Sequence, residues 1–172
     1  ALFGNSAHDI IIGGTGSGDV HEAYSVTLPQ GLEHAGYATD KALSQAYAQH
    51  IKAEKARRPE TNPFLAPPPL PELVPTIEQI DAAVAANDVG VIMIGRNSGE
   101  FIDRKAEGDF YLTEAEQTLI RNVSAAFHKA GKPVVVVLNI GGVIEVASWR
   151  DQVDAILLAW QPGQEAGHAM AD

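Results

Sequence analysis

Four short runs of apolar residues divide the sequence, and each has the length of a buried β-strand. In chain order they cover 1–3, 89–94, 133–138 and 155–159, and the third contains four consecutive valines. Continuous apolar runs of this length are typical of parallel strands that are covered on both faces, whereas half-exposed strands alternate apolar and polar residues. The runs therefore predict a buried, parallel sheet.

Helical patterns separate the strands. They cover about 25–35, 41–58, 76–87 and 113–130, and two short helices are expected near Val143 and Gly163. The clearest begins with Thr113-Glu114-Ala115-Glu116, a capping box in which the hydroxyl and the carboxylate accept each other's backbone amides, and it ends before Gly131. Strands that alternate with helices form βαβ units. The predicted fold is α/β, a three-layer α/β/α sandwich with a mostly parallel sheet.

The length and composition suit one globular domain covering residues 1–172, with 45% hydrophobic and 20% charged residues. One segment, 59–75, holds most of the ten prolines and is expected to be an extended surface connection. A lid, or a strap that docks a neighbouring domain, is the alternative reading of this segment. The chain opens on Ala1 rather than Met and stops inside a helical pattern. We therefore expect it to be excised from a larger protein.

Charge and residue usage exclude several classes of function. The formal net charge of −10 disfavours binding to phosphate backbones, so no nucleic-acid partner is expected. No apolar run approaches the roughly 18–20 residues of a membrane span, so no membrane partner is expected. The absence of cysteine removes disulfides, zinc–thiolate sites and thiol nucleophiles. The six histidines show no metal-binding spacing, and neither a metal nor an organic cofactor is implied.

Reactive loops of parallel α/β folds leave the carboxyl ends of the strands. This rule selects the loops at 13–24, 95–111, 139–142 and 161–167. The first is rich in glycine between Gly13 and Gly18, but it fits neither the dinucleotide-binding pattern nor the P-loop, which needs a lysine. A nucleotide-binding Rossmann-like domain is therefore disfavoured, and the loop remains open to two readings, a flexible turn or a turn that approaches a polar ligand.

The second loop places four carboxylates and two cations within residues 98–109. Glu100 lies between Gly99 and Phe101, so it can face a ligand while an aromatic ring shields it. A carboxylic acid that donates a proton near neutral pH needs a raised pKa, which burial or a neighbouring anion supplies. A solvated charged loop is the alternative. Elsewhere, Glu145 is expected at a helix N-terminus. The two tryptophans are expected in the core or at domain contacts rather than as sugar-stacking platforms.

Taken together, these motifs resemble the C-terminal α/β domain of glycoside hydrolase family 3, and they are similar to the bacterial β-glucosidases of that family. The resemblance spans nearly the whole chain, in order and at compatible spacing. It rests on the following segments: Ala1-Leu2-Phe3-Gly4, 13–20, Ser98-Gly99-Glu100 with Asp103-Arg104 and Gly108-Asp109-Phe110, 134–139, Ile144-Glu145-Val146, and 159–167.

The resemblance implies a retaining β-glucosidase that releases terminal β-linked glucose from oligosaccharides or glucosides. Such enzymes use two carboxylates, a nucleophile and an acid/base. In this family the acid/base falls on the α/β domain, and the match places it at Glu100. Ser17, with Gly16 beside it, is implied to bind the sugar. Asp103 and Arg104 are implied to support the substrate site.

The rest of such an enzyme does not appear in this sequence. The family's nucleophile is an aspartate of an N-terminal barrel domain, and nothing here resembles that barrel. The implied partners are therefore the β-glucoside substrate and a barrel domain of the same polypeptide. A proton donor without a nucleophile lacks the covalent step, so the isolated chain is expected to be inactive. The alternative is a non-catalytic α/β carbohydrate-binding or scaffold domain, since a fold alone does not fix a function.

Overall fold

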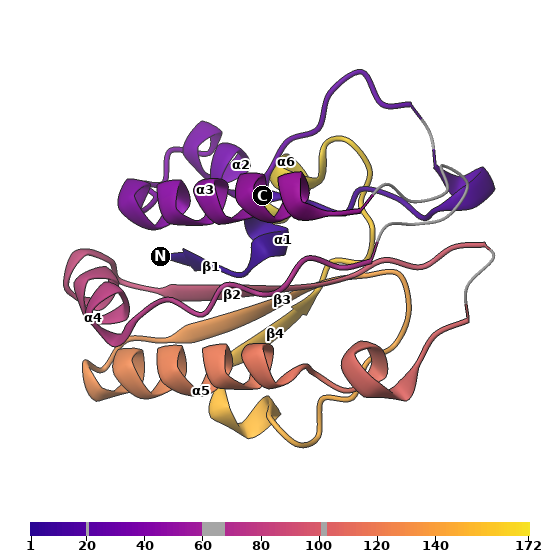
Figure 1. Cartoon of the computed structure of the whole chain (residues 1–172). Coiled ribbons are helices and arrows are strands. Elements are labelled where there is room, and N and C mark those ends of the chain that lie inside the picture. The colour runs from indigo at the N-terminus through magenta and orange to yellow at the C-terminus, as the bar shows by residue number, and fades with distance from the viewer. Residues whose placement is uncertain (20, 60–67, 101–102) are drawn as a thin grey trace.

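A parallel sheet of four strands forms the middle layer of the structure (Figure 1). The computed structural model describes residues 1–19, 21–59, 68–100 and 103–172. Within these residues the strands lie side by side in chain order, as β1 (Leu2–Phe3), β2 (Gly90–Arg96), β3 (Val134–Ile140) and β4 (Ala155–Leu158). Each neighbouring pair runs parallel. The four apolar runs thus mark the strands, and the predicted parallel pairing is confirmed.

Both central strands extend two residues beyond the apolar runs that predicted them. Gly95 pairs with Asn139, and Arg96 pairs with Ile140. The ladder is made by backbone groups, so a polar side chain can occupy it wherever that side chain finds its own partners. As a result, Arg96 and Asn139 lie buried at the carboxyl edge of the sheet.

Helices cover the sheet on both sides. The helices α3 (Lys41–Arg57), α4 (Ile77–Ala86) and α5 (Glu114–Lys129) contribute to one core cluster, and α2 (Leu28–His34) and α6 (Ala166–Ala171) contribute to the other. The predicted three-layer α/β/α sandwich is confirmed. A further helix, α1 (Asn5–His8), follows β1 directly. It was not predicted, because a single turn is too short to show a helical period.

The predicted capping box of α5 is present. The Glu116 amide donates to the Thr113 hydroxyl at 3.2 Å, and the Thr113 amide donates to the Glu116 carboxylate at 2.8 Å. The other end of α5 is followed by Gly131, whose φ of +71° suits a residue without a side chain. Local chemistry therefore fixes both ends of this helix.

The prediction of a short helix starting near Val143 is wrong. The Glu145 amide donates to the Phe110 carbonyl at 2.8 Å, so the backbone there is bound to another segment. The Glu145 carboxylate accepts from the amide and the hydroxyl of Ser148 at 2.7 and 2.6 Å. Glu145 consequently caps a turn instead of an α-helix. The next helical element after Glu145 is a 3₁₀ turn at Arg150–Gln152, shortly before β4.

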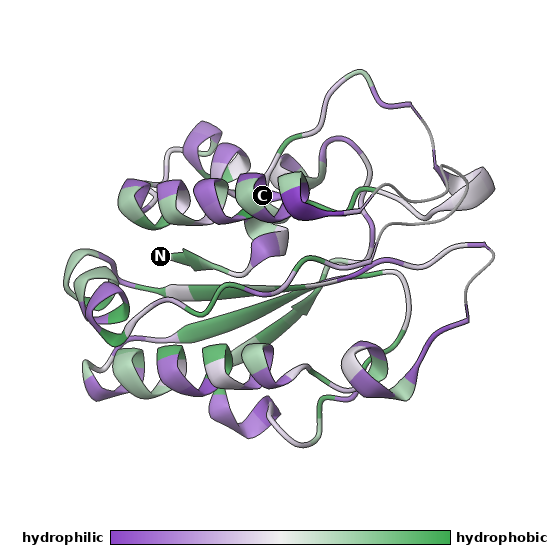
Figure 2. Cartoon of the chain, in the orientation of Figure 1, coloured by the Kyte–Doolittle hydropathy of each residue, from purple (hydrophilic) through white to green (hydrophobic). Residues whose placement is uncertain are grey.

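The core consists of two clusters, one on each face of the sheet. Successive residues of β2 alternate between them: Ile92 and Ile94 pack with Phe127 of α5, whereas Met93 packs with Leu28 of α2. Figure 2 shows the strands as the most hydrophobic part of the chain. This two-sided burial explains the uninterrupted apolar sequences of β2 and β3. The fourth run differs, because all four residues of β4 are exposed in this chain, and the predicted burial of that strand is wrong here. In the described parts of the chain, no helix is both long and apolar enough to cross a membrane.

The two tryptophans differ in environment. Trp149 is buried in the larger cluster, as expected for a core residue. Trp160, directly after β4, is 48% exposed and has a φ of +55°, which is uncommon for a residue with a side chain. Its indole is therefore not part of the core.

The proline-rich connection is described only in part, because residues 60–67 lie outside the described residues. The remainder lies along α1 and α3. The Asn5 side-chain amide donates to the Pro71 carbonyl at 2.8 Å, and an imidazole nitrogen of His50 lies 2.8 Å from the same carbonyl. The Glu72 carboxylate accepts from the Asn5 backbone amide at 2.9 and 3.1 Å. These contacts attach the connection to the start of α1.

Candidate active site

Two loops from neighbouring strands meet at the carboxyl edge of the sheet, on the right of Figure 1. One follows β1 and α1, and the other follows β2. Thr15 and Gly99 form a parallel bridge, and the Thr15 amide donates to the Ser98 carbonyl at 3.0 Å. The loops are thus joined by backbone contacts immediately before Gly16 and Glu100.

The contact brings Ser17 onto the Glu100 carboxylate. The Ser17 hydroxyl donates to Oε1 at 2.6 Å, and the Ser17 amide donates to Oε2 at 3.0 Å. The two residues are 83 positions apart in the sequence. Both are exposed, so a ligand can reach the pair from solvent. The structure therefore brings together the two residues that the motif resemblance singled out.

Glycine is required where the loops approach each other. Gly16 has a φ of +72°, and a Cβ on it would lie 2.6 Å from the Glu100 Oε2 atom and 2.7 Å from the Glu100 Cβ. A Cβ on Gly99 would lie 1.9 Å from the Thr15 hydroxyl oxygen. Distances this short exclude a side chain, so the glycine-rich first loop serves close approach rather than flexibility alone.

The electrostatic environment of Glu100 differs from the expectation. Hydrogen bonds from the Ser17 hydroxyl and then from the Ser17 amide lower the pKa of Glu100 below its ordinary value. The carboxylate is exposed, and desolvation, which would raise its pKa, is outweighed by these hydrogen bonds. The expected raised pKa is therefore not found in this chain alone. Phe101, the expected shield, lies outside the described residues.

Arg104 and Asp103 differ in their surroundings. The Arg104 guanidinium donates to Asp109 at 2.6 and 3.1 Å and to the Val143 carbonyl at 2.6 Å. Partial burial raises the pKa of Asp109, but the hydrogen bonds from Arg104 and the Lys105 amide bring it below its ordinary value. Asp103 is exposed. Arg104 thus shapes the loop beside Glu100.

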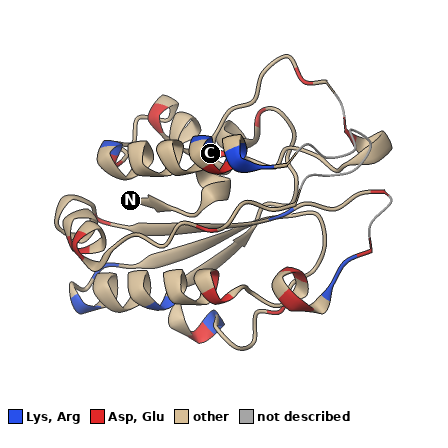
Figure 3. Cartoon of the chain, viewed as in Figure 1, with Lys and Arg blue, Asp and Glu red and all other residues tan. Residues whose placement is uncertain are grey.

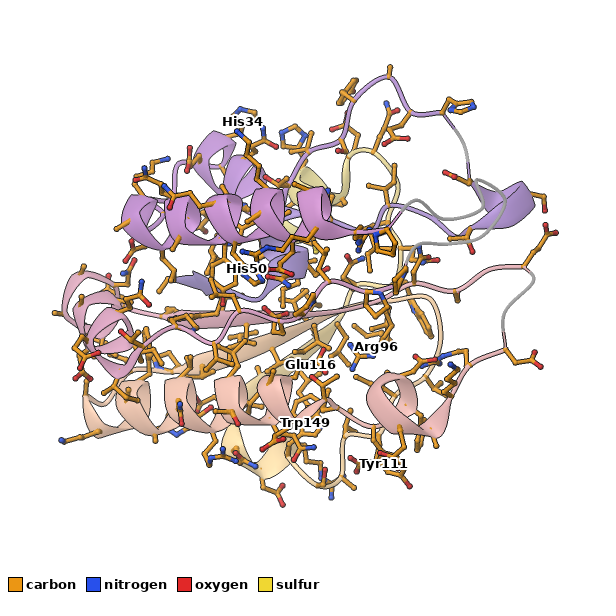
Figure 4. The ribbon with its side chains drawn as sticks, in the orientation of Figure 1. His34, His50, Arg96, Tyr111, Glu116 and Trp149 are labelled. Atoms are coloured by element: carbon orange, nitrogen blue, oxygen red, sulfur yellow. The ribbon has the colours of Figure 1, made fainter. Side chains whose placement is uncertain are left out.

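A buried ion pair at the base of this loop was not predicted. The Arg96 guanidinium donates to both Glu116 oxygens at 2.6 and 2.7 Å, and Figure 4 shows the two side chains pointing toward each other. The sequence signalled Glu116 only as a cap of α5. Its second partner, Arg96, lies at the end of strand β2, and a local pattern carries no information about such a contact.

Asn139 was part of a recognised motif but had no role assigned. It is fully buried, and its Oδ1 accepts from the Ser6 hydroxyl and the Ile11 amide, both at 2.8 Å. Its Nδ2 donates to the carbonyls of Ile11 and Trp160 at 2.8 and 2.7 Å. All four hydrogen bonds of the side-chain amide are satisfied. Asn139 therefore connects β3 to α1 and to the residues that lead into the first and the fourth loop.

The third and fourth loops also contact the second. The Ser98 hydroxyl donates to the Gly141 carbonyl at 3.0 Å, and the Gln161 side-chain amide donates to the Asn97 side chain at 3.1 Å. All four loops selected from the strand ends thus converge at one edge of the sheet, as the parallel topology predicts.

Charges of both signs follow β2 in the second loop (Figure 3). Within the described ranges, no group of three or more His, Cys, Asp or Glu side chains is arranged to hold a metal ion. The arrangement instead offers an exposed carboxylate held by a hydroxyl, which suits proton transfer to a polar ligand.

Comparisons with known proteins agree on one family. The family model described as the glycosyl hydrolase family 3 C-terminal domain matches residues 1–172. β-Glucosidase A of Butyrivibrio fibrisolvens is 34% identical over 99% of this chain and 23% of its own length. A β-glucosidase of Ruminococcus albus is 28% identical over 99% of this chain and 18% of its own length.

The solved structures that resemble this chain are also β-glucosidases. β-Glucosidase 3B from Thermotoga neapolitana, in complex with glucose, has a TM-score of 0.92 and 44% identity over 99% of this chain and 24% of that chain. A β-glucosidase from Paenibacillus barengoltzii has a TM-score of 0.87 and 30% identity, and 19% of that chain is covered. The chain thus spans less than a quarter of the length of these relatives.

Proposed function

This chain belongs to the C-terminal domain family of glycosyl hydrolase family 3, and from that membership we propose that it is the acid/base domain of a retaining β-glucosidase. The whole protein hydrolyses terminal β-linked glucose from oligosaccharides or glucosides. Residues 1–172 form one domain of that enzyme, and 59–75 is a surface connection within it. An N-terminal barrel domain of the same polypeptide supplies the nucleophile.

The proposal rests on the contact between Ser17 and Glu100. Two loops that are far apart in the sequence bring this hydroxyl and this carboxylate within 2.6 Å of each other. A sugar seated against the edge of the sheet can then receive a proton from Glu100 and donate a hydrogen bond to the Ser17 hydroxyl oxygen, whose own proton is donated to Glu100. The Thermotoga relative was solved with glucose, which supports a sugar ligand for this family.

The reaction needs two opposite proton transfers from Glu100. In the first step the protonated carboxyl group donates to the leaving oxygen while the nucleophile attacks the anomeric carbon. In the second step the carboxylate removes a proton from the water that releases the sugar. The lowered pKa in this chain keeps Glu100 in the carboxylate form from which the second step starts. Docking of the barrel domain buries Glu100 and brings an anionic nucleophile to about 5–5.5 Å, and both changes raise the pKa for the first step.

The remaining assignments follow from position. Gly16 allows the sugar-binding loop to approach Glu100, since a Cβ there would overlap the carboxylate. Arg104 supports the loop through Asp109 and Val143. Asp103, which is exposed, contributes to the substrate site as the resemblance implies. The isolated chain, which lacks the nucleophile, has no glycosidase activity of its own. Saturable hydrolysis of a β-glucoside by the pure chain would contradict this assignment.

The test is Glu100→Ala in the parent polypeptide, assayed on aryl β-glucosides with good and poor leaving groups. We expect kcat/KM to fall steeply for the poor leaving group and little for the good one, because only the poor one needs protonation. Azide should restore kcat on the good leaving group and yield a glycosyl azide of retained configuration. Glu107→Ala, a change of another exposed carboxylate in the same segment, is the control.

An equal loss on both substrates without azide rescue would reject Glu100 as the acid/base. Asp103 and Glu107 would then be the next carboxylates to test. An unchanged enzyme would instead favour a non-catalytic, carbohydrate-binding or scaffold role for the domain.

A further inference from the structure

Arg96 is a buried cation at the end of β2. It is 8% exposed, and its partner Glu116 is 5% exposed. Besides the two bonds to Glu116, the Arg96 Nε atom donates to the Asp109 carbonyl at 2.8 Å, and one terminal nitrogen donates to its neighbour Gly95 at 2.7 Å. A buried charge needs this degree of pairing, because an unpaired one is strongly unfavourable.

These contacts join the two ends of the segment that carries Glu100. The chain leaves the sheet at Arg96, continues through Glu100, and returns at Asp109 shortly before α5. The Arg96 side chain reaches from the first end to the second through the Asp109 carbonyl. Through Glu116 it also reaches the first turn of α5. One guanidinium therefore fixes where the segment begins, where it ends, and how it sits on the next helix.

The partner is itself held in place. The Thr113 amide and hydroxyl donate to the Glu116 Oε2 atom at 2.8 and 2.9 Å, while the Arg96 guanidinium contacts both oxygens. The side chain of Glu116 has little freedom to move, so the Arg96 side chain it binds is also fixed. Bidentate pairing between a guanidinium and a carboxylate sets orientation as well as distance.

We propose that Arg96 and Glu116 form a clamp that positions Glu100 for proton transfer, an inference that rests on the proposed function. Neither residue touches the substrate, so both are positioning residues. Catalytic groups must be held within about 0.5 Å of their productive position, and displacements near 1 Å can cost about 100-fold in rate. An exposed loop that carries such a group needs a rigid base, and the clamp provides one.

The experiment uses two conservative changes in the full-length parent enzyme. Glu116→Gln keeps an N3 side chain that can still complete the capping box of α5, but it removes the charge opposite Arg96. Arg96→Lys keeps the charge and loses the bidentate geometry. Glu114→Gln removes an exposed carboxylate from the same helical turn and is the matched control.

The measurement is the ratio of kcat/KM for aryl β-glucosides with poor and good leaving groups. Each ratio comes from a single preparation, so it does not depend on the folded fraction. Misplaced acid catalysis should lower the ratio by about 10- to 100-fold in both clamp variants. The control should leave it unchanged.

An unchanged ratio in the folded clamp variants, whatever their total activity, would overturn the proposal and assign the pair to stability alone. Failure of both conservative variants to fold would lead to the same conclusion. These results are distinct from failure of the proposed function, which is read from Glu100→Ala. If Glu100→Ala discriminates between leaving groups and the clamp variants do not, the acid/base assignment stands and only the clamp is rejected.

Discussion

The hydrogen bonds of Asn139 give the sharpest test of how the candidate site is held together. Replacing this residue by leucine keeps a similar volume in a fully buried position. It leaves four groups without their partner: the Ser6 hydroxyl, the Ile11 amide, and the carbonyls of Ile11 and Trp160. An orphaned buried polar group costs about 1–3 kcal/mol.

Relaxation and water will offset part of this loss, so we expect a local destabilisation of about 3–5 kcal/mol. The matched control is Ser6→Ala, which removes one of the four bonds, while Asn139 Oδ1 keeps the Ile11 amide at 2.8 Å. A single hydrogen bond contributes about 1 kcal/mol, and the control should cost no more than about that amount.

Hydrogen–deuterium exchange of the full-length enzyme measures this effect directly, because the Ile11 amide is itself one of the donors to Asn139. A local loss of about 3 kcal/mol corresponds to roughly 100-fold faster exchange. Peptides that cover 5–12 and 158–163 should accelerate in Asn139→Leu and change little in Ser6→Ala. Equal exchange in the two variants would refute the claim that Asn139 joins these loops.

Two further predictions concern the site loop and the connection. Gly16→Ala should lower kcat/KM on poor leaving groups, because its Cβ would overlap Glu100, whereas Gly18→Ala, whose Cβ meets nothing within 4 Å, should not; equal behaviour of the two would contradict the close approach. Burial raises the pKa of Glu72 from 4.5 to about 8, so the folded state binds its proton more tightly than the unfolded state does. The free energy of unfolding should therefore fall as pH rises from about 5 to 8, by at most about 1.4 kcal/mol per pH unit. The free energy of unfolding of Glu72→Gln, measured by denaturation across that range, should lack this dependence on pH. The same dependence in the variant would refute the assignment to Glu72.

Much of the architecture follows from local sequence. The apolar runs predict all four strands, and for β2 and β3 the reason is that a strand covered on both faces must be apolar at successive positions. The exposed β4 shows that an apolar run indicates a strand but not its burial in this chain. The Thr113 capping box and Gly131 fix both ends of α5, because their chemistry acts within one helical turn. The convergence of the four loops follows from parallel topology alone. The sequence motifs indicate the family by their resemblance to it, and that resemblance singles out Ser17 and Glu100.

Only the tertiary structure decides how those loops are joined. The Ser17–Glu100 contact, the Arg96–Glu116 pair and the four bonds of Asn139 each connect segments that no local period relates. The same applies to Glu145, whose backbone bond to Phe110 replaces the helix that its own sequence favours. Local patterns report the energies of neighbouring residues, whereas a buried polar side chain is satisfied by whatever the fold brings within 3 Å of it. The sequence by itself therefore determines the layers and the candidate residues, and the packed structure decides which of them act on one another.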